Sequence, residues 1–220
     1  MRNIFLGAVM STTLAFTAAG DAQSAASVEE VVSPGGIRGY LLHEPAVPML
    51  AVSFLFKGGA QYESADEAGL ARMTAALLDE GAGEMDSQAF RGALEDNAIR
   101  LSFDADRDGI NGELRTLTAN RELAFELLRK ALTEPRFDAE PIERIRAQLQ
   151  AGLKRRLNDP GVISRRAWFA AAFGEHSYAH PADGRVETVA ELGREAIVGY
   201  HAVQFARDKL HIGVAGDITA

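Results

Sequence analysis

The histidines are the first side chains to consider for chemistry, because imidazole serves as a metal ligand and as a general acid or base near neutral pH. The chain has five of them, and only His176 and His180 lie close together, four residues apart. Pro181 and the small residues around this pair predict a loop rather than a zinc-binding helix turn. Neither a His-Glu-x-x-His nor a His-x-x-Glu-His motif occurs. A structural role is the default, with relocated chemistry at His176, His180 and Glu175 as the alternative.

A second candidate for chemistry is the acidic segment at residues 104–109 (DADRDG), whose alternating carboxylates resemble the start of a calcium-binding EF-hand loop. Such a loop requires a bidentate Glu at its twelfth position, where this chain has Arg115. The eighth position, usually apolar, is Asn111. The segment is therefore interpreted as an acidic turn between two strands, with a calcium site as the alternative.

The composition excludes several other classes of protein. The chain has 220 residues, of which 47% are hydrophobic and 25% charged, as in an ordinary globular protein. It has no cysteine, so disulfide frameworks, thiolate zinc sites and cysteine nucleophiles are excluded. The formal net charge of −8 argues against sequence-independent binding of nucleic acid, which needs a basic face. Neither a Gly-x-Ser-x-Gly motif nor a P-loop occurs.

The elements that must position these side chains are strands and helices in irregular succession. Apolar patterns predict strands at 28–32, 36–44, 49–57, 99–104, 110–118 and 210–215. Apolar spacings of three and four predict helices from 66 to 80, after Asp86, after Asn120, from Asp138 to 157, around Trp168 and within 188–205. Asp86, Asn120 and Asp138 are predicted N-caps. Two strand pairs each precede a pair of helices, which predicts an α+β two-layer sandwich rather than a doubly wound parallel sheet.

The first residues are expected to be a targeting segment. Arg2 precedes an apolar run over 4–19, and small residues follow up to Ala26. This order is typical of a secretory signal peptide at residues 1–26. The alternative is a membrane anchor, for which the run is short. The chain is therefore expected to be exported, with no membrane span after signal removal.

Several short segments, taken in order, resemble the pitrilysin/insulinase family of inverted-motif zinc metallopeptidases. Residues 50–83 (LAVSFLFKGGAQYESADEAGLARMTAALLDEGAG) are similar to the family's opening strand, glycine turn and Gly-Leu-Ala helix start. Residues 134–138 (EPRFD), 180–184 (HPADG) and 213–218 (GVAGDI) continue in the same order. The likeness covers about residues 28–220. It implies a mixed, largely antiparallel sheet with helices packed on one face, as in the mitochondrial processing peptidase.

The resemblance also locates the positions of the family's zinc motif. The family carries His-x-x-Glu-His on its first helix, where the two histidines bind zinc and the Glu polarises the metal-bound water. With residues 69–71 (GLA) placed on the family's helix start, the two His positions are Arg72 and Ala76, and the Glu position is Ala75. The resemblance therefore implies the family's fold with none of its catalytic residues on this helix.

The third zinc ligand of the family is a Glu on the long later helix. Counting along this chain places it at Ala151 or Gly152, neither of which has a side-chain oxygen. The resemblance thus implies no metal, no cofactor and no enzyme activity in this chain by itself. Zinc is expected only in a catalytic partner chain.

Paired systems of this family suggest a role. In them a zinc-bearing chain works with a ligand-less homologue. The resemblance implies that this chain is such a non-catalytic subunit, exported to a periplasm, where it binds its catalytic homologue and helps to enclose an extended peptide. A stand-alone peptide-binding or scaffold module of the same fold is the alternative. Family members carry two similar domains, so residues 27–220 are expected to form a single N-terminal domain, cut off before a second.

Overall fold

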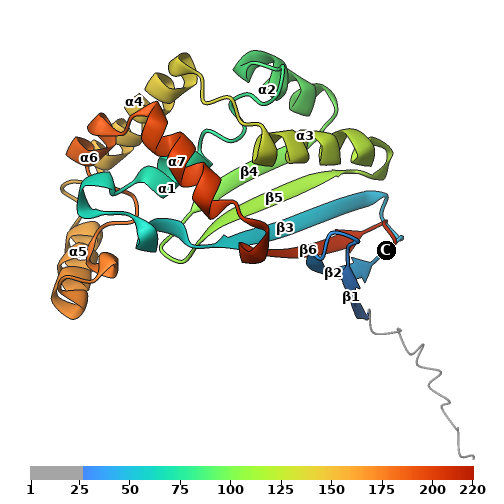
Figure 1. Ribbon diagram of the computed structural model, residues 1–220, viewed down its shortest axis with the longest axis horizontal. Coiled ribbons are helices and arrows are strands. Elements are labelled where there is room, and N and C mark those ends of the chain that lie inside the picture. The colour runs from blue at the N-terminus through green and yellow to red at the C-terminus, as the bar shows by residue number, and fades with distance from the viewer. Residues whose placement is uncertain (1–26) are drawn as a thin grey trace, which may run out of the picture.

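A computed structural model describes residues 27–220, so the expected signal peptide lies outside the described residues. In this part of the chain six strands form one sheet in the order β1-β2-β6-β3-β5-β4, and the helices lie over one of its faces (Figure 1). The strands are β1 (Val28–Val32), β2 (Arg38–His43), β3 (Met49–Lys57), β4 (Arg100–Ala105), β5 (Gly109–Leu117) and β6 (Leu210–Gly216).

The pairing of the strands makes the sheet mixed but largely antiparallel. Only β2 and β6 run parallel, and the other four neighbouring pairs are antiparallel. The last strand of the described chain, β6, therefore inserts between β2 and β3. The predicted α+β two-layer sandwich, with helices on one face, is confirmed. The strands β1 and β4 form the two edges of the sheet.

The helices begin and end near the predicted residues, with some differences. They are α1 (Leu70–Ala75), α2 (Ser87–Asp96), α3 (Arg121–Thr133), α4 (Ala139–Arg155), α5 (Pro160–Phe173), α6 (Val186–Glu191) and α7 (Arg194–Gln204). No helix within residues 27–220 is long and apolar enough to cross a membrane.

The capping predictions have mixed outcomes. Asp86 caps α2 as predicted, because its carboxylate accepts a hydrogen bond from the N–H of Ala89. Asn120 makes no side-chain cap, since its amide donates to the carbonyl of Asn97 instead. Asp138 also makes no cap, because its carboxylate binds Arg136. Both residues stand at the N-cap positions of α3 and α4, as predicted, but neither side chain caps its helix because each binds another polar partner.

The largest difference concerns the predicted helix at 66–80. The structure has a short 3₁₀ turn at Ala65–Glu67, then α1 over only six residues, and turns after it. Gly69 interrupts the helix because it takes a left-handed φ of +101°. A Cβ on Gly69 would lie 3.0 Å from Gly184, so the two glycines let residues 181–184 pack closely against the start of α1.

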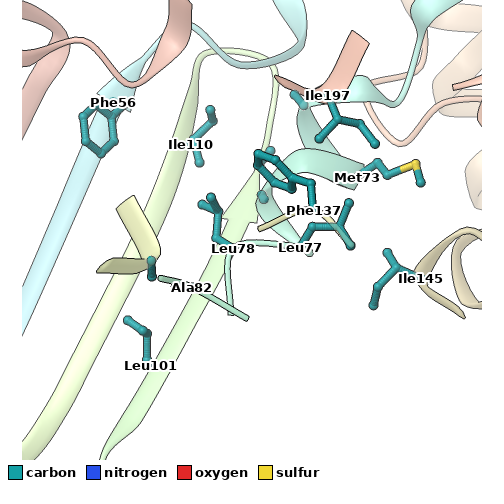
Figure 2. Packing of buried hydrophobic residues seen from close by; sticks show 14 of the residues in the cluster. Phe56, Met73, Leu77, Leu78, Ala82, Leu101, Ile110, Phe137, Ile145 and Ile197 are labelled. Atoms are coloured by element: carbon teal, nitrogen blue, oxygen red, sulfur yellow. The ribbon is translucent and has the colours of Figure 1, made fainter. Parts of the chain in front are cut away.

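The core lies between the sheet and the helices. In β3, Leu50, Val52, Phe54 and Phe56 are buried, and the residues between them face the open side of the sheet. From α1, Met73 points into the same cluster as Phe137 and Ile197 (Figure 2). This packing fixes α1 by its apolar side and leaves Arg72 on another side of the helix.

Candidate functional site

The start of α1 is held by a buried carboxylate. Glu63 is only 8% exposed, and its two oxygens accept hydrogen bonds from the N–H groups of Gly69 and Ala71, at 2.9 and 2.5 Å. Burial raises the pKa of Glu63 to about 7, although both N–H donors oppose the rise. Glu63 therefore serves the first turn of α1 as a capping group supplied from outside the helix.

Arg72 extends from α1 into a chain of ion pairs. Its Nη1 lies 2.6 Å from Oδ1 of Asp104 on β4 and 3.8 Å from Oδ1 of Asp183. Asp183 also pairs with Arg156, just after α4, at 3.1 Å. This series of ion pairs links α1, the sheet edge, the loop before α6 and the end of α4. Its four side chains are between 31% and 63% exposed, so these ions remain in contact with water.

The other two positions of the expected zinc motif carry only methyl groups. Ala75 is 1% exposed within the core, and Ala76 is half-buried at the C-terminal end of α1. Neither offers a ligand atom, and Arg72 carries a positive charge that repels a divalent cation. The side chains at these three positions do not fit a zinc ion.

The expected third position is equally unsuited to a metal. Ala151 is exposed on α4, and Gly152 is half-buried. A Cβ on Gly152 would lie nearest to the guanidinium groups of Arg155 and Arg156, at 3.8 and 4.0 Å. Within residues 27–220, no three His, Asp or Glu side chains converge in a way that could hold a metal ion.

The acidic segment at residues 104–109 contains the turn between β4 and β5, at residues 106–108, as predicted. The Asp106 carboxylate accepts hydrogen bonds from the N–H groups of Asp108 and Gly109, at 2.8 and 2.9 Å. Asn111 adds a weaker contact at 3.3 Å. The carboxylate that an EF-hand would turn towards calcium is therefore bound to its own backbone.

The histidine pair also has local structural partners. His176 accepts a hydrogen bond from the N–H of Tyr178, and a 3₁₀ turn at Ser177–Ala179 separates it from His180. The predicted loop is thus partly a 3₁₀ turn. Tyr178 in turn donates from its hydroxyl to Asp108. This hydrogen bond fastens the segment to the β4–β5 turn.

Beside Arg72 lies a pocket of about 280 Å³ that the sequence did not indicate. It is lined by side chains of α1, the end of β4, the β4–β5 turn, α5 and the loop before α6; its basic residues are Arg72, Arg107, Arg165 and Arg166. The Arg107 guanidinium stacks 3.7 Å from the centre of the Phe169 ring. The adjacent pair Arg165-Arg166 was the only sequence signal available.

Comparisons with known proteins agree with this fold. The model of the family described as Insulinase (Peptidase family M16) matches residues 40–181. The non-peptidase homolog YmxG of Helicobacter pylori is 25% identical over 172 residues, which cover 78% of this chain and 40% of that protein. The uncharacterized zinc protease ML0855 of Mycobacterium leprae is 26% identical over 210 residues, covering 90% and 44%.

Solved structures show the same architecture. A peptidase M16 inactive domain from Pseudomonas fluorescens matches with a TM-score of 0.82 and 25% identity, covering 88% of this chain and 47% of that one. The periplasmic protease PqqL of Escherichia coli matches with a TM-score of 0.76 at 13% identity, covering 88% and 22%, and shows the fold alone. The chain spans less than half the length of these relatives. Since the family model matches most of its residues, the chain belongs to the insulinase family, peptidase family M16.

Proposed function

We propose that this chain is a non-catalytic member of the insulinase family that binds a zinc-bearing catalytic homologue and holds part of an extended peptide substrate. The observation that carries the proposal is the pairing of Arg72 with two carboxylates. In the proposed alignment Arg72 stands at the first zinc ligand, and its guanidinium binds Asp104 and Asp183. In this proposal, a guanidinium paired with two carboxylates stands where the catalytic homologue binds its metal. The names of two relatives, a non-peptidase homolog and an inactive domain, support this reading.

The edge strand β4 is the proposed place for the peptide. Among the described residues β4 pairs only with β5, so one side of its backbone has no strand partner. An extended peptide gains main-chain hydrogen bonds by pairing with such an edge. β4 also lies beside α1, and its Asp104 is the partner of Arg72. The opposite edge, β1, is separated from this site by the four other strands.

The proposal extends to the domain organisation of the chain, its export and the location of zinc. Residues 27–220 form the N-terminal domain of a longer chain with a second, similar domain, supported by the half-length coverage of the relatives. The chain is exported through the signal-like residues 1–26 and works in a periplasm, as PqqL does. Zinc belongs to the partner chain alone.

The test is affinity capture of the tagged natural protein from the periplasm of its own host. Its zinc content is measured by mass spectrometry, and the captured proteins are identified and assayed for peptidase activity. We expect far less than one zinc per chain, together with a captured homologue that carries His-x-x-Glu-His and has chelator-sensitive activity. One tightly bound zinc per chain would overturn the non-catalytic role. Peptide binding without any captured peptidase would favour the stand-alone module.

A further inference from the structure

The pocket beside Arg72 contains more positive charge than its acidic side chains neutralise. Its lining carries four arginines and three aspartates, so its formal charge is +1. Asp104 and Asp183 form ion pairs with Arg72 and Arg156, and the Asp106 carboxylate accepts hydrogen bonds from the backbone of its own turn. None of the ion pairs within residues 27–220 includes Arg165 or Arg166, although both line the pocket. Two guanidinium groups therefore face this space with their donors available for a ligand.

The helix α5 presents these groups on one side. Val162, Arg165, Arg166 and Phe169 all line the pocket, and their spacings of three and four residues place them along one helix face. The Arg107 guanidinium stacks on the Phe169 ring, and its Nε and Nη2 donate to the carbonyls of Tyr178 and His180, both at 3.4 Å. The pocket thus combines Arg107, which is fixed by stacking and hydrogen bonds, with Arg165 and Arg166, which pair with no carboxylate in the described part of the chain, and with the aromatic ring of Phe169.

The place of the pocket connects it with the proposed peptide path. Asp104 and Ala105, the last residues of β4, lie in its wall together with the turn that follows. A peptide paired with the β4 edge would reach the pocket at that end. Guanidinium groups bind carboxylates through paired N–H donors, which gives charge-assisted hydrogen bonds.

Resting on the proposed peptide binding, we propose that this pocket binds a carboxylate of the bound peptide through Arg165 and Arg166. The carboxylate is supplied either by an Asp or Glu side chain or by the peptide's C-terminus. This chain would then select acidic peptides or peptide ends, although its own net charge is −8. Local positive charge in a pocket, rather than the net charge of the chain, decides the preference.

The test uses the full natural chain and four otherwise identical peptides of nine polar residues. Three have blocked ends and carry Glu, Gln or Lys at the centre, and the fourth is the Gln peptide with a free C-terminal carboxylate. Binding is followed by titration calorimetry and by tryptophan fluorescence. Trp168 is the only tryptophan in the 220-residue sequence, and its ring centre lies 4.9 Å from that of Phe169 in the pocket wall. The part of the fluorescence change that is lost in a Trp168→Phe variant therefore reports on this pocket.

We expect the Glu peptide, the free-ended peptide or both to bind about tenfold more tightly than the blocked Gln peptide, the strength of one charge-assisted hydrogen bond. Which of the two gains affinity identifies the source of the carboxylate. The double variant Arg165→Gln/Arg166→Gln should abolish the gain. The matched control is Arg121→Gln, at an exposed arginine at the start of α3, and it should keep the gain.

The outcomes separate this proposal from the proposed function. Equal affinity for all blocked and free peptides would overturn the carboxylate site and leave peptide binding in place. A gain that survives the double variant would also overturn it, because the charge would then be read elsewhere. If no peptide binds, the pocket proposal fails, and capture of a catalytic homologue decides separately whether the subunit role holds.

Discussion

The guanidinium of Arg72 lies 2.6 Å from the carboxylate of Asp104, and this ion pair joins the first helix to the edge strand of the sheet. The two residues are 32 positions apart in the sequence. The pair stands beside the proposed peptide path and forms part of the pocket wall. Both side chains remain in contact with water, so the pair should add little to stability. Its interest lies in its place beside the proposed peptide path.

The variant Arg72→Ala should therefore fold normally. We expect its free energy of unfolding to fall by less than about 1 kcal/mol, the usual size for an exposed ion pair. Urea denaturation measures the change, and a double-mutant cycle with Asp104→Ala isolates the pair itself. A loss well above that value, shared with Asp104→Ala, would mean that the pair is needed to hold α1 in place.

A second ion pair should behave differently because it is buried. Arg144 contacts both oxygens of Glu80, at 3.1 and 2.6 Å, and the Glu80 side chain is only 7% exposed. Arg144→Ala would leave this carboxylate buried with Arg91, 3.5 Å away, as its remaining cation, so we expect a loss of about 2 kcal/mol. The control is Arg129→Ala, whose pair with Glu134 is about half exposed and should cost under about 1 kcal/mol. Equal losses in the two variants would contradict this assignment.

Glu63 should make stability depend on pH. Its pKa in the folded chain is raised by burial from 4.5 to about 7, so the folded state holds the proton that the unfolded state releases above pH 4.5. The contribution of Glu63 to the free energy of unfolding should then decrease as the pH rises from about 4.5 to about 7, by roughly 3 kcal/mol, and level off above that range.

The variant Glu63→Gln does not titrate and should lack this decrease. Urea denaturation from pH 4 to pH 8 gives the difference between the natural chain and the variant at each pH. The matched control is Glu191→Gln, at an exposed residue at the end of α6, which should follow the natural chain. A difference between the natural chain and Glu63→Gln that stays constant over this range would rule out the raised pKa.

Because Gly184 lies close to the backbone of Ala68, adding one methyl group at Gly184 should destabilise the fold. Gly184 has a φ of +81°, and a Cβ there would lie 2.5 Å from the carbonyl oxygen of Ala68. Gly184→Ala should therefore lower the free energy of unfolding by about 2 kcal/mol or more, through strain and through separation of the loop from α1. Gly199→Ala, at an exposed position in α7 with no atom within 4 Å of the added Cβ, should be neutral or stabilising by up to about 1 kcal/mol. Thermal denaturation of both variants makes the comparison.

Local patterns in the sequence determined much of the fold. The predicted strand at 49–57 is β3 to the residue, because its alternating apolar side chains pack against the helices whatever lies beside it. The N-cap at Asp86 was also predictable, since a cap depends on residues within one turn. The N-cap positions of Asn120 and Asp138 were predictable too, but the partners that draw their side chains away from the helix ends were not.

The length of the first helix was not predictable from local patterns. Apolar spacing continued from residue 66 to residue 80, but Gly69 takes a left-handed φ that no spacing reveals. The close contact of Gly69 with Gly184 arises from residues 115 positions apart, and the buried Glu63 replaces the cap that the helix lacks. Packing over long sequence distances thus decided where α1 begins.

For the site, the sequence by itself determined what is missing: methyl groups or a guanidinium at the expected ligand positions, and no cysteine. Only the tertiary structure decided what stands there instead. It joins Arg72 to Asp104 and Asp183 from two other segments, and it brings Arg107 onto Phe169 of α5. The physical reason is that charge pairing and stacking act over a few ångströms in space, whereas the sequence records only neighbours along the chain.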